Sequence, residues 1–265
     1  MRISYRAHGG SKDYWQRRWD KLSIDNGAMN LERYPGLFAE RLINGDRPDG
    51  LILEAGCGAG RVLRHYHDQG IEIVGLDFIA SVLGALHRED ASIPLAAGDI
   101  TTLPFPDETF SAVLAFGLYH GLEIGLEAAM ADTRRVIKRG GVLCASMRLD
   151  NLQNRVGDRM ADRKAASRAA GSRKSFHKVN LTMAEFKALV TGAGFRLETV
   201  SFVENMSFLY KFAALRHASQ KLFDESAARR AGYRFNMLGH ALQRAAMALI
   251  PAQMANLAVI TARAI

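Results

Sequence analysis

The chain has little of several features that would place it in other classes of protein. It has only two cysteines, Cys57 and Cys144, in 265 residues, which excludes a disulfide framework, offers no zinc-ligand spacing and is typical of a reducing compartment. No apolar run approaches the ~20 residues that a membrane-spanning helix needs. The first twenty residues are polar and charged, so no signal peptide is expected. Together these absences predict a cytoplasmic protein, long enough for one substantial core and an added lid.

Acidic residues are outnumbered, at 27 against 35 lysines and arginines, and the imbalance is uneven along the chain. Residues 1–20, 148–180 and 207–250 carry net charges of +3, +6 and +5, while the whole chain carries +8, so the remainder is acidic at −6. A sequence pI near 9.7 is compatible with a nucleic-acid partner. However, aromatic residues scarcely interleave with the basic segment, and there is no appended RNA-binding motif. Nucleic acid is therefore not the expected partner.

What the chain does have, over residues 51–61, is an apolar run that ends in Glu54 and continues into three glycines at alternate positions. The run predicts a buried strand, and the pattern that follows predicts a helix. Glycine permits a sharp turn and lets a ligand approach the backbone, because no Cβ is in the way. The first turn of the helix offers unpaired N–H groups to a negatively charged end of that ligand. This segment is typical of a nucleotide-type cofactor loop on the first strand of a doubly wound sheet.

Acidic residues also end the next two predicted strands. Residues 72–77 form an apolar run that ends in Asp77, 23 residues after Glu54, where a carboxylate can accept both hydrogens of a ribose diol. Residues 94–100 form a third run that contains Asp99, placed to reach an adenine amino group. Either aspartate alone is more simply explained as a helix N-cap, but the two spacings together favour ligand binding. Strands and helices continue to alternate up to about residue 148, which predicts a parallel sheet.

An ordered set of motifs resembles the class I S-adenosylmethionine-dependent methyltransferases, in particular their type 11-like small-molecule and lipid branch, which includes the quinone methyltransferases. The motifs are Glu54-x-Gly56-x-Gly58-x-Gly60, Asp77, Gly98-Asp99, Leu103-Pro104-Phe105-Pro106 and Lys138-Arg139-Gly140-Gly141. The resemblance covers residues 45–150 closely and the later elements loosely. It implies an α/β fold with a doubly wound, Rossmann-like sheet of seven strands. Most strands would be parallel, with an antiparallel pair at the C-terminal edge and a helical lid insertion.

The resemblance also implies S-adenosyl-L-methionine as the cofactor, and no metal. Glu54 would favour the methionyl ammonium, Asp77 would bind the ribose, and Asp99 would take the adenine edge. The residues expected at the cofactor are Glu54, Gly56, Cys57, Gly58, Gly60, Asp77, Phe78, Ile79, Gly98, Asp99, Ile100, Phe116 and Gly117.

Two residues after the fourth strand, Tyr119 and His120, are the candidates for catalysis, because family members commonly place acceptor-side groups there. His120 is the first candidate for a base or an orienting group, although a histidine bonded to a nearby carbonyl is equally compatible with the sequence. His177 is a weaker candidate. Direct displacement at the methyl carbon depends largely on alignment, and a general base is optional, since a phenol or enol acceptor ionises easily whereas an alcohol needs help.

The segments around the core are expected to build the lid. Residues 1–45 are predicted as an N-terminal helical lid segment, including a helix at 14–20, and residues 46–265 as the methyltransferase domain. That domain would hold a basic insertion at about 148–180, with an amphipathic helix followed by a loop over 165–178. A helical insertion follows at about 207–250. A capping box at Thr182 predicts the start of a helix, and 195–203 and 256–265 predict the late strands.

The expected acceptor is a small molecule or a lipid-like compound. The chain lacks the Asn-Pro-Pro-Tyr-like tetrad that base-amino methyltransferases carry after the fourth strand. Residues 237–250 mark an apolar helical face with basic margins, which either packs on the sheet or suits a peripheral contact at the inner membrane surface. Two other functions stay open: a non-catalytic cofactor-binding scaffold with a basic docking surface, and an NAD-type oxidoreductase, which Glu54, Asp99 and the late strand pair disfavour.

Overall fold

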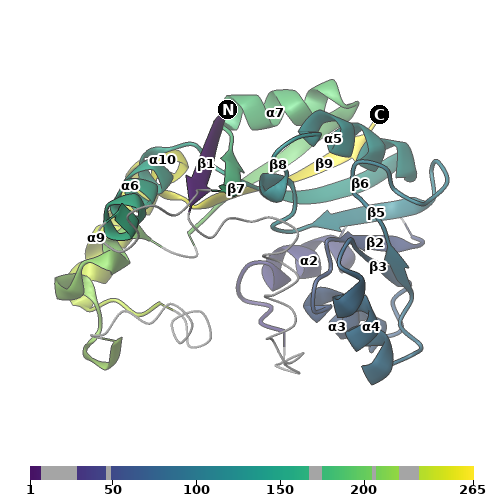
Figure 1. The fold of residues 1–265 in the computed structure, drawn as a ribbon, viewed down its shortest axis with the longest axis horizontal. Helices are drawn as coiled ribbons and strands as arrows, with labels where there is room; N and C mark the ends of the chain where they lie inside the picture. The colour runs from purple at the N-terminus through teal and green to yellow at the C-terminus, as the bar shows by residue number, and fades with distance from the viewer. Residues whose placement is uncertain (7–28, 46–48, 167–174, 205–206, 221–232) are drawn as a thin grey trace.

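A seven-stranded sheet forms the centre of the molecule in the computed structural model, which describes residues 1–6, 29–45, 49–166, 175–204, 207–220 and 233–265 (Figure 1). Its strand order is β4-β3-β2-β5-β6-β9-β8. In that order the strands span Leu95–Ala97, Ile73–Asp77, Ile52–Ala55, Phe110–Ala115, Ile137–Arg148, Leu257–Ala264 and Phe195–Val203. The first five strands pair in parallel, whereas β9 pairs antiparallel with both β6 and β8. The predicted fold class, including the antiparallel edge pair, is confirmed.

Helices cover both faces of this sheet, as expected when parallel strands are joined by crossovers. On one face, α2 (Gly36–Ile43), α3 (Arg61–His67) and α4 (Ala80–Glu89) bury apolar side chains against β2, β3 and β5. On the other face, α5 (Leu126–Val136) and α7 (Met183–Gly192) cover the strands (Figure 1). The helix α7 begins at the predicted capping box: the Thr182 hydroxyl accepts the Glu185 N–H, and the Glu185 carboxylate accepts the Thr182 N–H.

A second, two-stranded sheet was not predicted. It pairs β1 (Arg2–Arg6) with β7 (Ser175–Asn180) in antiparallel orientation. The first residues of the chain are therefore a strand and not part of a helical segment, and residues 175–178 are a strand and not a loop. The helix predicted at 14–20, including Tyr14, Trp15 and Trp19, lies outside the described residues, as do 167–174 of the predicted loop. The strand β7 follows α6 (Leu152–Ala166), the amphipathic helix that was predicted.

The later insertion is less regular than predicted. Within its described part, three short 3-10 helices, η2 (Phe208–Lys211), η3 (Ala213–Leu215) and η4 (Ala218–Gln220), precede α9 (Met237–Leu249). The helix α9 ends just before Pro251, which begins the short helix α10 (Pro251–Met254), because proline is well tolerated in the first turn of a helix. The apolar face of α9 does not pack on the sheet: Gly239 and Gln243 are buried, whereas Leu238, Leu242 and Leu249 are exposed.

Candidate active site

A cleft of about 1110 Å³ lies where the order of the parallel strands reverses. From β2 the chain moves outward to β3 and β4 and then returns to β5, on the other side of β2. The connections that follow β2 and β5 therefore run to opposite faces of the sheet and leave a crevice between them. Doubly wound sheets bind ligands in such a crevice. The walls of the cleft come from these strand ends, from η1 (Tyr119–Gly121), and from β6 and β7.

The loop after β2 turns through three glycines with positive φ angles. Gly56, Gly58 and Gly60 have φ values of 73°, 52° and 68°, in the left-handed region that glycine adopts without steric cost. Gly56 and Gly58 line the cleft. Gly60 does not line it but precedes the first residue of α3 and fixes the direction in which that helix leaves the loop.

Glu54, the last but one residue of β2, lies buried under this loop. Its Oε2 accepts the backbone N–H of Leu63 in the first turn of α3, at 2.8 Å. Burial raises the pKa of the Glu54 carboxyl to about 8, with the Leu63 hydrogen bond opposing and the nearby Asp77 adding to the shift. A cationic ligand group at this point of the cleft would restore the ionised carboxylate.

Asp77, at the end of β3, is buried and holds two backbone segments together. Its Oδ2 accepts the Gly58 N–H at 2.9 Å, and its Oδ1 accepts the Ile79 N–H at 3.0 Å. Burial raises the pKa of Asp77, and these backbone hydrogen bonds oppose the shift. Each carboxylate oxygen has a second lone pair, so the side chain can organise the loop and still accept a ligand hydroxyl.

The connection after β4 presents Gly98 and Asp99 to the cleft. A Cβ on Gly98 would lie 2.8 Å from Cδ of Pro104, so this close contact requires glycine and explains why the Gly98-Asp99 and Leu103-Pro104 motifs occur together. The exposed Asp99 carboxylate accepts the Thr101 N–H and hydroxyl, both at 2.8 Å. It therefore forms a local turn as well as facing the cleft.

Eleven of the thirteen residues predicted at the cofactor line this one cleft: Glu54, Gly56, Cys57, Gly58, Asp77, Phe78, Gly98, Asp99, Ile100, Phe116 and Gly117. Of the other predicted residues, Ile79 is fully buried in the core beside α4, where only its N–H serves the site through Asp77. Phe78 is 41% exposed, so its ring is accessible to a flat ligand group.

Tyr119 does not line the cleft, contrary to its prediction as an acceptor-side group. The side chain is fully buried in the core that α5 covers. Its hydroxyl lies 2.7 Å from the Thr133 hydroxyl. The residue packs η1 against α5, because consecutive residues of a tight helical turn point in different directions. His120, one position later, points into the cleft.

The end of β5 is tied to β6 and to the N-terminal segment through Ser146. Its Oγ accepts the Gly117 N–H at 2.8 Å and lies 2.9 Å from the Tyr34 hydroxyl. Tyr34 lines the cleft, and burial raises the pKa of its phenol. Neither Tyr34 nor Ser146 carried a sequence signal, since each belongs to no motif.

His120 is 6% exposed and forms one wall of the cleft with Lys178 of β7. Its Nε2 lies 3.2 Å from the Lys178 Nζ, and its Nδ1 is buried without a hydrogen-bond partner among the described residues. Burial, reinforced by the positive charges of Lys178 and Arg148, holds the pKa of His120 well below its usual value. The histidine is therefore neutral at physiological pH.

His177, the other histidine proposed, does not line the cleft, whereas its neighbours Phe176 and Lys178 do. Side chains alternate between the two faces of a strand, so within β7 only the even-numbered residues can face the cleft. Burial and the nearby Arg6 lower the pKa of His177 to about 3. A strand assignment for 175–180 would have identified Lys178 from the sequence.

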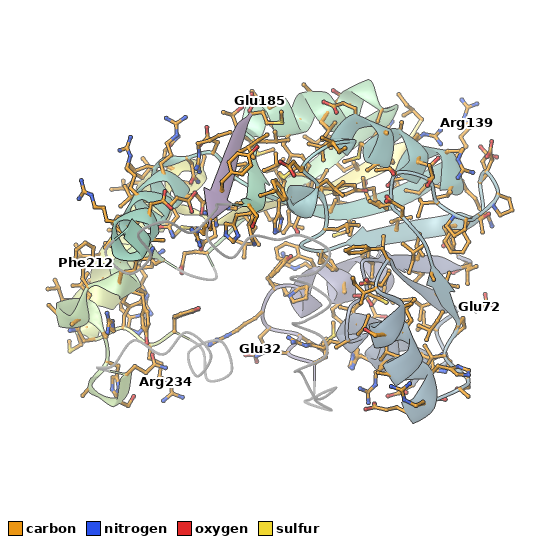
Figure 2. The ribbon with its side chains drawn as sticks, viewed as in Figure 1. Glu32, Glu72, Arg139, Glu185, Phe212 and Arg234 are labelled. Atoms are coloured by element: carbon orange, nitrogen blue, oxygen red, sulfur yellow. The ribbon has the colours of Figure 1, made fainter. Side chains whose placement is uncertain are left out.

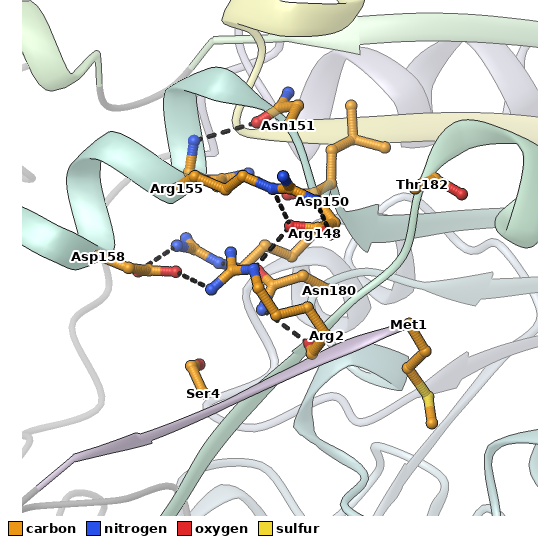
Figure 3. Close-up of polar contacts among 12 residues, drawn as sticks. Met1, Arg2, Ser4, Arg148, Asp150, Asn151, Arg155, Asp158, Asn180 and Thr182 are labelled. Carbon is orange, nitrogen blue, oxygen red and sulfur yellow. Dashed lines mark hydrogen bonds and ion pairs between the residues drawn. The ribbon is translucent and has the colours of Figure 1, made fainter.

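Behind this wall, a cluster of arginines shares two carboxylates (Figure 3). Asp158 of α6 forms ion pairs with Arg2, Arg6 and Arg148 at 2.7–2.9 Å. Asp150 pairs with Arg2 and Arg155. Of these arginines, Arg148 also lines the cleft. Among the described residues, no group of His, Cys, Asp and Glu side chains could hold a metal ion, and no helix has the length and apolarity needed to cross a membrane.

Comparison with known proteins gives matches concentrated on the part of the chain that contains the glycine loop. Residues 53–145 match the family model of a methyltransferase domain. The demethylmenaquinone methyltransferase of Renibacterium salmoninarum is 34% identical over 129 residues, covering 48% of this chain and 46% of that protein. The malonyl-[acyl-carrier protein] O-methyltransferase of Enterobacter lignolyticus is 30% identical over 92 residues, covering 35% and 36%. The chain thus spans less than half the length of these curated relatives.

Solved structures share the fold over a larger part of the chain. A SAM-dependent methyltransferase from Methanosarcina mazei superposes with a TM-score of 0.57 at 15% identity, covering 88% of this chain and 98% of that one. The [4+2]-cyclase SpnF superposes with a TM-score of 0.54 at 19% identity, covering 100% and 87%. Because proteins with different names share it, the fold alone does not fix the reaction.

Proposed function

We propose that this chain, which carries a class I S-adenosylmethionine-dependent methyltransferase domain, transfers the methyl group of S-adenosylmethionine to a small-molecule or lipid-like acceptor. The observation that carries the proposal is the single cleft in which the glycine loop, Glu54, Asp77 and Asp99 meet His120 and Lys178. One end of that cleft has the groups that a nucleoside with an amino acid end requires, and the other has groups for an acceptor.

The residues of the cleft fit the proposed cofactor better than they fit a dinucleotide. Buried carboxylates at Glu54 and Asp77 repel a pyrophosphate but favour an ammonium and a ribose diol. Gly56 and Gly58 carry no side chains and so leave space for a carboxylate near the start of α3, while their own N–H groups donate to Leu76 and Asp77. Glu54 would hold the ammonium, Asp77 the ribose, Asp99 the adenine amino group, and the accessible Phe78 ring the adenine face.

The chemistry that the cofactor supplies is an electrophilic methyl carbon bound to a positive sulfur. Gly117, at the end of β5, lies beside His120: a Cβ at Gly117 would be 3.9 Å from the His120 Cε1. Gly117 therefore leaves space beside the acceptor wall, and its N–H is held by Ser146. The chain contributes to the reaction mainly by keeping the acceptor and the methyl group in line and by excluding water.

The acceptor class follows from the apolar and basic character of the second half of the cleft, where Leu118, Leu122 and Phe176 accompany Lys178 and Arg148. The names of the two relatives describe methylation of a quinone precursor and of an acyl-carrier-bound malonyl group. Both are consistent with an acceptor that has an acidic or enolic oxygen near an apolar portion.

The direct test is to incubate the purified protein with methyl-labelled S-adenosylmethionine and a metabolite and lipid extract. The expected result is one class of extractable compound that gains the label, and no label in added RNA or DNA. Binding of S-adenosylhomocysteine without transfer to any compound would favour a cofactor-binding scaffold. Binding of NAD in its place would favour an oxidoreductase.

A peripheral contact with an anionic membrane surface is a second part of the proposal. The face of α9 formed by Leu238, Leu242 and Leu249 is exposed, and Phe212 of the same insertion is 46% exposed (Figure 2). Residues 233–265 contain no aspartate or glutamate but three arginines, of which Arg234 and Arg244 are exposed. Apolar side chains flanked by positive charge favour an interface of anionic lipid.

Cosedimentation with vesicles tests this contact. Phosphatidylglycerol vesicles are expected to bind the wild-type protein, whereas vesicles of phosphatidylcholine alone bind it weakly. The double variant Leu238→Asp, Leu249→Asp should lose most of the binding. Ile265→Asp, an equally exposed apolar residue at the end of the chain, is the matched control and should bind as the wild type does. Equal binding by all three proteins would contradict the proposed surface.

A further inference from the structure

A short chain of hydrogen bonds links the ends of β5 and β6 to the segment that precedes α2. Gly117 donates its backbone N–H to the Ser146 Oγ at 2.8 Å, and the Tyr34 hydroxyl lies 2.9 Å from the same oxygen. The Ser146 side chain is completely buried. Within the described part of the chain, its hydroxyl has these two hydrogen-bond partners and no third.

Ser146 must be the donor to Tyr34. The Gly117 N–H can only donate, so the Ser146 oxygen accepts in that bond. If it also accepted from Tyr34, the Ser146 proton would be buried without an acceptor, which costs free energy. Ser146 therefore donates its proton to the Tyr34 oxygen. The Tyr34 proton is then left without an acceptor among the described residues.

The Tyr34 hydroxyl lies at the cleft beside Gly117, and both residues line it. The Tyr34 Oη and the His120 Cε1 are each 3.9 Å from the position that a Cβ on Gly117 would take. The phenol and the imidazole edge thus flank one point of the cleft, which Gly117 leaves free of a side chain. An edge contact with Phe116 holds the Tyr34 ring, with the centroids 5.7 Å apart. A molecule bound at this point can accept the Tyr34 proton.

Tyr34 remains a donor at physiological pH, because burial raises the pKa of its phenol. A neutral O–H group pairs with an oxygen that has a free lone pair, such as that of a carbonyl or a carboxylate. An ammonium group has only donors and cannot accept this proton. The point beside Gly117 therefore favours a molecule that presents an acceptor oxygen.

The strand order separates this donor from the groups proposed for the cofactor. Glu54, Asp77 and Asp99 belong to β2, to β3 and to the connection after β4, whereas β5 and β6 lie on the other side of β2. Gly117 follows β5, and Ser146 belongs to β6. The Tyr34 proton is thus available on the side of the cleft away from the proposed ribose and adenine groups.

We propose that the Tyr34 O–H group binds a carbonyl or carboxylate oxygen of the acceptor, and that Ser146 is the positioning residue that leaves this proton free. The inference rests on the methyl-transfer function proposed above and narrows its substrate class to compounds with such an oxygen next to the reacting atom. The hydrogen bond aligns the acceptor for transfer. Tyr34 keeps its proton throughout, so it orients the acceptor and is not a base.

The experiment compares two probes of the same shape, acetophenone and 2-phenylpropene, which carries a methylene group in place of the carbonyl oxygen. The full-length protein is first saturated with S-adenosylhomocysteine, whose binding is measured by calorimetry, and each probe is then titrated by NMR. The ratio of the two dissociation constants isolates the contribution of the oxygen. Tyr34→Phe, which removes only the hydroxyl, should shift this ratio against acetophenone by about threefold to tenfold, as for one neutral hydrogen bond.

Infrared spectra of acetophenone labelled with carbon-13 at the carbonyl give a direct signature, because the carbonyl stretching frequency falls when the oxygen accepts a hydrogen bond. The frequency of the bound probe should be higher in Tyr34→Phe than in the wild type. Ser146→Ala keeps the phenol but no longer directs its proton, so an intermediate frequency is expected. Tyr66→Phe is the matched control, since the buried Tyr66 hydroxyl donates to Glu40 at 2.8 Å outside the cleft. It should change neither the ratio nor the frequency.

The outcomes separate the two proposals. If the wild-type protein does not bind S-adenosylhomocysteine, the proposed function itself fails. If it does, but acetophenone does not bind, or the ratio and the frequency are the same in Tyr34→Phe, the acceptor role of Tyr34 is wrong. A loss of S-adenosylhomocysteine affinity in Tyr34→Phe with an unchanged ratio would assign Tyr34 to the cofactor and also contradict the proposal. A changed ratio and frequency with unchanged S-adenosylhomocysteine affinity supports it.

Discussion

The two halves of the cleft are built in different ways. The cofactor half consists of strand ends within residues 54–117, and its polar groups are mostly paired with backbone N–H groups of the same region. The acceptor half brings together η1, the end of β6 and β7, with β1 behind them. In this half, the buried His120 Nδ1 has no hydrogen-bond partner among the described residues. The first half is acidic and locally determined, and the second is basic and assembled from distant segments.

This difference indicates a division of roles. In the cofactor half, the carboxylates that would bind the ligand also hold the loop in place. This half is therefore suited to one constant ligand. A half whose charges come from a separate small sheet can change without disturbing the loop, and so can specialise for a particular acceptor. If this is correct, substitutions in one half should leave binding in the other half nearly unchanged.

The largest effect is expected for Asp77→Ala. Because Asp77 is buried and hydrogen-bonded to the loop, its loss should weaken S-adenosylhomocysteine binding about tenfold to a hundredfold, as for other charge-assisted hydrogen bonds. Calorimetry measures the affinity, and a thermal unfolding curve shows whether the variant is folded. Glu72→Ala is the matched control, because Glu72 is an exposed carboxylate just before the opposite end of β3 (Figure 2). Equal affinities of the two variants would rule out the ribose assignment.

Lys178→Met should produce the opposite pattern. S-adenosylhomocysteine affinity should stay within about twofold of the wild type, whereas kcat/KM for the acceptor found in the extract should fall about tenfold or more, as for loss of a charged contact to the reacting group. Transfer assays and calorimetry on the same preparation measure the two quantities. If both fall together, the halves are coupled and the division of roles is wrong.

Glu54 should couple cofactor binding to the release of a proton. The pKa of Glu54 is raised to about 8 by burial, so the carboxyl is largely protonated at pH 7, and the ligand ammonium should ionise it. S-adenosylhomocysteine affinity should therefore rise between pH 6 and 8, by at most about tenfold per pH unit. Calorimetry in buffers with different ionisation enthalpies measures the released proton, which Glu54→Gln should abolish. A pH-independent affinity in the wild type would contradict this coupling.

The same shift sets a trend in the stability of the unliganded protein. Between the ordinary carboxyl pKa of 4.5 and the folded value of about 8, the folded state binds more protons at Glu54 than the unfolded state does. The contribution of Glu54 to the free energy of unfolding should therefore decrease as the pH rises through this window. Comparing urea unfolding of the wild type and Glu54→Gln at pH 5 and pH 8 isolates this contribution, which should be absent in the variant.

The smallest effect on ligand binding is expected for Gly98→Ala, which tests the packing under the cofactor half. The added methyl group would meet Pro104 at 2.8 Å, and such overpacking typically lowers the free energy of unfolding by about 1–3 kcal/mol. Gly192→Ala, where a Cβ meets nothing within 4 Å, is the control and should be neutral or slightly stabilising. Urea unfolding of both variants measures the difference, and equal stability would contradict the tight contact.

The cofactor half could be predicted from the sequence because its residues lie at fixed points of short repeating units. A strand, a carboxylate and a glycine turn are local patterns, and parallel strand ends meet at one edge of the sheet. Tyr119 was assigned wrongly because spacing alone does not say which residue of a 3-10 turn faces the cleft. Lys178 was not selected because residues 165–178 were expected to form a loop, whereas 175–180 form a strand that pairs with β1, more than 160 positions away in the chain.

Calorimetric titration of the wild-type protein with S-adenosylhomocysteine and, separately, with NAD tests the proposed cofactor site most directly. One saturable site is expected for S-adenosylhomocysteine, weakened by Asp77→Ala and unaffected by Lys178→Met, and no measurable heat is expected with NAD. No binding of S-adenosylhomocysteine, or equal binding of NAD, would contradict the proposed site.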